Sequence, residues 1–90
     1  MQAIHAIISG RVQGVSFRAF VSAWANELRL KGFVKNLHTG EVEIIAEGEK
    51  QKLEEFIKIL EKGAPSSHIK ECRNEWIFPS NNFSDFSIEY

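Results

Sequence analysis

The sequence predicts an α+β fold: a ferredoxin-like, split β-α-β sandwich (βαββαβ), with one antiparallel sheet carrying two helices on one face. Two observations lead to this prediction. Strand-like and helix-like hydrophobic patterns follow one another in the order β-α-β-β-α-β, with the last β element split by a turn. The 90 residues, 43% hydrophobic and 26% charged, are enough for one core, so residues 1–90 are expected to form a single domain.

The first strand is expected over residues 2–9, where apolar residues occupy both faces, as in a strand inside a sheet. A helix should follow from about Ser16 or Phe17 to about Arg29, with Ser16 or Val15 near its N-cap. The stripe that should face the core comprises Phe17, Val21, Trp24, Ala25 and Leu28.

Residues 32–37 and 41–47 read as a hairpin, joined by a short turn at residues 38–40. The second of these strands alternates cleanly, which predicts one buried and one solvated face. Its inward residues are Val42, Ile44 and Ala46, and its outward residues are Glu41, Glu43 and Glu47.

The second helix should begin after Gly48 and stop at Gly63-Ala64-Pro65. Its apolar stripe comprises Leu53, Phe56, Ile57 and Leu60. A fourth strand is expected over residues 68–78, with Cys72, Trp76 and Phe78 on its apolar register. After a turn at residues 79–82, the last strand, residues 83–90, places Phe86, Ile88 and Tyr90 on one face.

Composition narrows the class of protein. No apolar run is long enough to span a bilayer, and the first residues lack a signal-peptide pattern, so we expect a cytoplasmic protein without a membrane partner. Cys72 is the only cysteine, which excludes an internal disulfide and a cysteine-based zinc cluster. Residues 1–40 hold five basic residues against one acidic, whereas residues 41–90 hold six against eleven. This distribution favours a small anion over nucleic acid, because nucleic-acid binders are usually basic overall.

The stretch between the first strand and the first helix has the features of an anion site. Gly10 and Gly14 relax the backbone there, and Arg11 and Arg18 flank the loop. Such a strand-to-helix turn aims backbone N–H groups at one point, at the positive end of a helix. Arg18 adds a planar, permanently charged fork. A phosphate or sulfate ion is the expected ligand.

Two motifs resemble those of the acylphosphatase family. The first is Gly10-Arg11-Val12-Gln13-Gly14-Val15-Ser16-Phe17-Arg18. The second is Gly32-Phe33-Val34-Lys35-Asn36, followed by a turn ending at Gly40 and by Glu41-Val42-Glu43. Departures from the family pattern are Arg29 at a common helix-ending glycine, Lys35 for a common arginine, and His38-Thr39 in the turn. None of them removes a candidate catalytic group.

The resemblance implies hydrolysis of acyl phosphates to a carboxylate and inorganic phosphate. It makes Arg18 and Asn36 the catalytic residues, and it assigns phosphate binding to the loop residues Gln13, Gly14, Val15, Ser16, Phe17 and Arg18. Because a carboxylate leaves without a general acid, the chemistry needs only a held phosphoryl group and an in-line water, which Asn36 would orient. We therefore expect no metal, no other cofactor and no covalent intermediate. The expected partner is a small acyl phosphate substrate, and the expected oligomeric state is a monomer.

Two other functions stay open at this point. One is a non-catalytic or regulatory module that binds an acyl or carbamoyl phosphate on the same fold. The other is an RNA-binding domain, which would need exposed aromatic residues and a basic sheet face; the acidic third strand argues against it. The remaining candidates for chemistry, His5, His38 and His68, are too scattered to form a catalytic or metal site.

Overall fold

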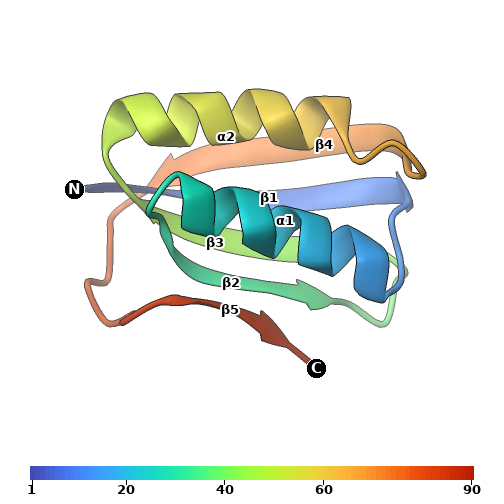
Figure 1. Ribbon diagram of the computed structural model, residues 1–90, viewed down its shortest axis with the longest axis horizontal. Helices are drawn as coiled ribbons and strands as arrows, with labels where there is room; N and C mark the ends of the chain where they lie inside the picture. Colours follow the sequence, from blue (N-terminus) through green and yellow to red (C-terminus); the bar gives the residue numbers. More distant parts are fainter.

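The computed structural model describes the backbone of residues 1–90 and the side chains except that of Val15. Five strands and two helices follow the predicted order (Figure 1). Their bounds are β1 Gln2–Arg11, α1 Val15–Glu27, β2 Lys31–Asn36, β3 Val42–Gly48, α2 Lys50–Lys62, β4 His68–Ile77 and β5 Phe86–Glu89. The predicted fold class is confirmed. Among the described residues, no helix is long and apolar enough to cross a membrane.

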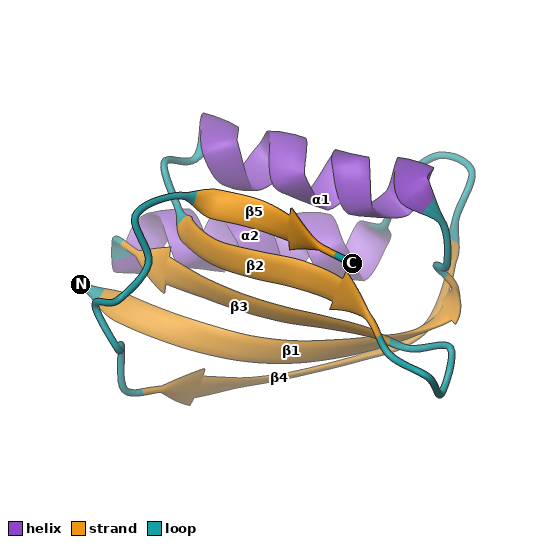
Figure 2. Cartoon of the chain, turned by 90° about the horizontal axis from the view of Figure 1, so that it is seen from below, coloured by secondary structure: helices purple, strands orange, loops and turns teal.

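The strands form one sheet in the order β4-β1-β3-β2-β5, and both helices cover the same face (Figure 2). Neighbouring strands are antiparallel except β2 and β5, which are parallel. The expectation of a wholly antiparallel sheet is therefore wrong at this one pair. The reason is the connection after β4, which carries the chain from one edge of the sheet to the other before β5 begins (Figure 1).

The core lies between the sheet and the helices. The inward residues predicted for β3 (Val42, Ile44 and Ala46) are fully buried, and so are Leu53, Phe56 and Leu60 of α2. Burying a large aliphatic or aromatic side chain contributes about 1.5–3 kcal/mol, so these two faces supply much of the stability.

Three aromatic residues that were expected on apolar stripes are instead exposed. Trp24, 40% exposed, lies beside Phe20 and Ile59 in a groove between α1 and α2. Trp76 and Phe78 are exposed at 44% and 97%. Trp76 lies near the end of β4, and Phe78 follows the last residue of this strand. β4 is an edge strand, and the space between α2 and Trp76 is open.

The two ends of α1 differ from the prediction. The N-cap is Gly14, with φ 111°, rather than Ser16 or Val15, and no side chain caps the helix. At the other end the helix stops at Glu27, before the predicted Arg29. Arg29 adopts φ 59°, and its N–H donates to the Asn26 carbonyl while the Leu30 N–H donates to the Ala25 carbonyl. This is a Schellman motif built on an arginine where glycine would be less strained.

Glu47 on β3 was expected to face solvent, but its side chain is 2% exposed. Its Oε2 accepts hydrogen bonds from the Ser80 N–H (2.6 Å) and hydroxyl (3.0 Å), and its Oε1 accepts one from the Asn81 N–H (3.2 Å). The connection between β4 and β5 therefore folds over this carboxylate. Alternation of polar and apolar residues along a strand cannot reveal that a loop covers a residue. The alternation assigns each side chain to a face of the sheet, but it does not show what packs on that face.

Replacing Glu47 with glutamine should lower the free energy of unfolding by about 1.5–3 kcal/mol, because hydrogen bonds to a charged acceptor are lost and an amide donor is turned toward backbone donors. Urea denaturation would measure this. Glu55→Gln, an exposed change on α2, is the control and should leave stability nearly unchanged. Equal midpoints for the two variants would contradict the role given to Glu47.

Candidate active site

The loop between β1 and α1 is shaped by a bulge and a helix start. The register of β1 against β4 shifts between Ser9 and Gly10. Gly10 has φ 127°, and a Cβ there would lie 2.1 Å from the His68 carbonyl oxygen, so only glycine fits. At Gly14 the chain turns into α1. The first N–H groups of a helix have no acceptor within it, and no side chain caps them here, so they are free to bind an anion.

The side chain of Gln13 ties this loop to the turn between β2 and β3. Its Nε2 donates to the Gly40 carbonyl oxygen at 2.7 Å and to the Glu41 carbonyl oxygen at 3.2 Å. The loop and the turn thus meet at one end of the sheet, which Figure 2 shows beside the start of α1.

Arg18 lies on the first turn of α1 and is 7% exposed. Its Nη1 donates to the Glu89 carbonyl oxygen at 3.1 Å, and its guanidinium carbon lies 4.8 Å from the centre of the Tyr90 ring. Within the described part of the chain, its buried Nε has no hydrogen-bond partner. A guanidinium does not lose its proton in proteins, so this is a buried cation with a donor to spare.

Asn36 is the last residue of β2, opposite Val42 of β3. The preceding Lys35 lies beside Glu89, whose carbonyl binds Arg18. The register therefore brings the strand end with Asn36 to the same end of the sheet as the Arg18 guanidinium. Asn36 Oδ1 is buried and, among the described residues, has no hydrogen-bond donor. Buried polar atoms without partners are rare, so these two atoms at the same end of the sheet mark it as the candidate site.

The remaining predicted loop residues have simpler positions. Ser16 is exposed on the first turn of α1, and Phe17 is buried in the core at 3% exposure. The backbone of Val15 begins α1, and its side chain lies outside the described part of the structure. Any contact of Val15, Ser16 and Phe17 with an anion would be made through their backbone N–H groups, as the prediction assumed.

Glu89 and Tyr90 are parts of this site that sequence reasoning missed. Tyr90 was placed on one face of a strand with Phe86 and Ile88, but its ring lies over Arg18 and is 92% exposed. Glu89 acts through its carbonyl group, which carries no sequence signal. The parallel pairing of β5 with β2 brings both residues to Arg18, and that pairing was not predicted.

The other titratable candidates lie away from this site. His5 bonds to Glu43 at 2.8 Å on the open face of the sheet, between β1 and β3. Cys72 on β4 is half-buried; burial raises the pKa of its thiol, a hydrogen bond with Asn74 opposes the shift, and the charge of Glu61 adds to it. In the described part of the chain, no three His, Cys, Asp or Glu side chains are grouped so as to hold a metal ion.

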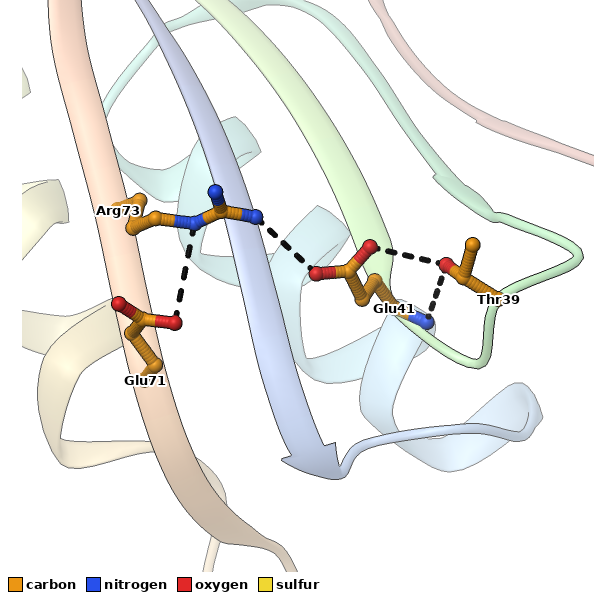
Figure 3. A network of polar contacts seen from close by, with 4 residues as sticks. All are labelled: Thr39, Glu41, Glu71 and Arg73. Atoms are coloured by element: carbon orange, nitrogen blue, oxygen red, sulfur yellow. Dashed lines mark hydrogen bonds and ion pairs between the residues drawn. The ribbon is translucent and has the colours of Figure 1, made fainter.

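The open sheet face does not have the composition of an RNA-binding surface. It carries opposed charges in ion pairs, including Arg73 with Glu41 at 3.1 Å and Lys35 with Glu43 at 3.8 Å (Figure 3 shows the first). RNA-binding sheets of this type present aromatic rings on central strands and a net positive charge. The central strands β1 and β3 present His5, Glu43 and Ile45 instead.

The buried Arg18 cation, the open helix start and the loop together have the chemistry of a binding site for a phosphate-like anion. Comparisons with known proteins identify the family of this chain. The Acylphosphatase family model matches residues 4–88. An Acylphosphatase of Dehalococcoides mccartyi (strain CBDB1) is 43% identical over 91 residues, which cover all of both chains. The chain therefore belongs to the acylphosphatase family, as its two motifs suggested.

Solved structures lead to the same family. The crystal structure of acylphosphatase from Bacillus subtilis matches the whole of both chains, with a TM-score of 0.94 and 38% identity. The chain is also similar to part of full-length HypF in its phosphate- and nucleotide-bound form, with a TM-score of 0.85 and 35% identity. That match covers 99% of this chain and 12% of HypF.

Proposed function

We propose that this protein hydrolyses acyl phosphates and that Arg18 and Asn36 carry the reaction. Membership of the acylphosphatase family supports the activity. The observation that carries the residue assignment is the buried Arg18 guanidinium, whose Nε has no partner among the described residues. An anionic phosphoryl group bound there would satisfy both its charge and its free donor.

In this proposal the phosphoryl group is held from two sides. The N–H groups at the start of α1, from Gly14 onward, bind its oxygens, and the helix dipole favours their negative charge. Arg18 binds through Nε, while its Nη1 stays on the Glu89 carbonyl. Donors aimed at the phosphoryl oxygens would stabilise the negative charge that develops in the transition state.

Asn36 orients the attacking water. Its Oδ1 accepts a hydrogen bond from the water, which turns an oxygen lone pair toward phosphorus, opposite the bond to the acyl oxygen. Water attacks, that P–O bond breaks, and its electron pair leaves with the carboxylate. The water proton passes to the phosphate or to solvent. The conjugate acid of the leaving carboxylate has a pKa of about 4, so the carboxylate leaves without being protonated by a general acid.

The runner-up is a module that binds an acyl or carbamoyl phosphate without turnover. The match to a small part of HypF shows that this fold also occurs within a larger protein. Full-length coverage of the D. mccartyi relative, itself named Acylphosphatase, favours the enzyme. The cytoplasmic location, the monomeric state and phosphate or sulfate binding stay predictions.

Purified protein should release phosphate from acetyl phosphate with EDTA present, because the mechanism uses only side chains and backbone donors. In water enriched in ¹⁸O, the label should enter the phosphate and not the acetate, because water attacks phosphorus. Phosphorus NMR would detect the labelled product. Absence of turnover would favour the binding module, and label in the acetate would refute attack at phosphorus.

Asn36→Ala should lower kcat by about a hundredfold, the scale seen when one group that positions or stabilises the reacting atoms is lost. Inhibition by inorganic phosphate should stay nearly unchanged, because the loop and Arg18 remain. Steady-state kinetics with phosphate as competitor would measure both. Asn82→Ala, a change at an exposed asparagine between β4 and β5, is the control. A kcat for Asn36→Ala equal to that of the control would rule out the water-positioning role.

A further inference from the structure

The turn between β2 and β3, residues 37–41, is bonded to both halves of the candidate site. The Glu41 carbonyl oxygen accepts the Leu37 N–H at 2.8 Å and the Gln13 side-chain amide at 3.2 Å. Leu37 directly follows Asn36. One carbonyl group therefore connects the strand end that bears Asn36 with the loop that precedes Arg18.

The turn is itself held by a polar network, shown in Figure 3. The Thr39 hydroxyl donates to Glu41 Oε1 at 2.9 Å, and the Glu41 N–H donates back to Thr39 Oγ1 at 3.3 Å. Glu41 Oε2 accepts a hydrogen bond from Arg73 of β4 at 3.1 Å. Arg73 Nε also lies 3.8 Å from Glu71 Oε1. The Arg73 side chain is 61% exposed, so its ion pair with Glu41 is weak and screened by salt.

The Gln13 amide has no donor left for an anion. A side-chain amide carries two N–H groups, and the carbonyl oxygens of Gly40 and Glu41 accept from that nitrogen. The remaining polar atom, the amide oxygen, only accepts, so it would repel a phosphate oxygen. Gln13 thus differs from the backbone donors at the start of α1, although it belongs to the same sequence motif.

We infer that the Gln13 side chain is a positioning group rather than a phosphate ligand: it fixes the distance between the phosphoryl-binding loop and Asn36. This inference rests on the roles proposed for the loop and Asn36. Among the described residues, no other side-chain hydrogen bond connects these two segments. Without the tie formed by Gln13, the loop still binds phosphate, but phosphorus and the attacking water are no longer held in line. Misplacement by about 1 Å is enough to cost about a hundredfold in rate.

Gln13→Met tests this assignment, because methionine keeps the length of the side chain and removes its donors. We expect kcat for acetyl phosphate to fall by about tenfold or more, and the inhibition constant of inorganic phosphate to change by less than about threefold. Gln51→Met, at an exposed position on α2, is the matched control. An unchanged kcat would overturn the inference. If the inhibition constant and KM rose together at constant kcat, the inference would also be overturned, and the Gln13 side chain would be a ligand instead.

Amide hydrogen exchange of the unliganded protein gives a readout that does not depend on turnover. In Gln13→Met, residues 13–18 and 37–41 should exchange faster than in the wild type, while the rest of the sheet stays protected. Unchanged exchange in both segments would overturn the tie. If the wild type does not hydrolyse acetyl phosphate, the proposed function fails, and the exchange result still decides the tie.

A double-mutant cycle tests whether Gln13 acts through the turn. Glu41→Ala removes the side-chain contacts with Thr39 and Arg73 but leaves the carbonyl acceptor in place. If both residues act through the position of the turn, the double variant should lose less kcat than the product of the two single losses. Independent effects that multiply would contradict a shared element.

Discussion

The constraint on which the site depends is the burial of a charge that cannot be removed. Arg18 is 7% exposed, and a guanidinium is a permanent cation in proteins. Burying such a cation without partners costs several kcal/mol. Among the described residues, the partners of Arg18 are the Glu89 carbonyl oxygen and the Tyr90 ring, and neither group carries a full negative charge. These partners orient the guanidinium without neutralising it, which favours an anionic ligand.

The sheet topology brings the parts of the site together. β1 ends in the loop, α1 carries Arg18, and β2 ends at Asn36. β5 runs parallel to β2, and this direction brings Glu89 and Tyr90 to the guanidinium. That pairing requires the chain to cross from β4 to the opposite edge of the sheet, and the buried Glu47 carboxylate anchors this crossing through Ser80 and Asn81. Glu47 is not part of the site, but it thereby helps to hold the strand that carries Glu89 in place.

The sequence was sufficient to predict whatever depends on local pattern. The alternation of Val42, Ile44 and Ala46, the stripe of Leu53, Phe56 and Leu60, and the order of elements were correct because periodicity reports directly on faces. The positions of Arg18 and Asn36 at one end of the sheet follow from that order. The prediction that Trp24 is buried was wrong. Trp24 lies at the margin of the apolar stripe of α1, where burial depends on how closely α1 and α2 pack.

Long-range contacts through backbone groups could not have been predicted in the same way. The Glu89 carbonyl that binds Arg18 and the Gly40 and Glu41 carbonyls that bind Gln13 are groups that almost any residue would provide. Hydrophobic patterning also cannot show that a loop covers Glu47. These contacts are what turn a generic anion loop into a site with fixed geometry.

Calorimetric titration with inorganic phosphate tests the central claim, that the buried Arg18 cation is the main ligand of the anion. Arg18→Ala should weaken binding by about tenfold or more, because a charge-assisted hydrogen bond contributes about 1.5–3 kcal/mol and tenfold corresponds to about 1.4 kcal/mol. Arg11→Ala removes an equal charge from an exposed position at the end of β1 and should change the affinity by less than about threefold. Equal affinities for Arg18→Ala and the wild type, or equal losses in the two variants, would contradict the account.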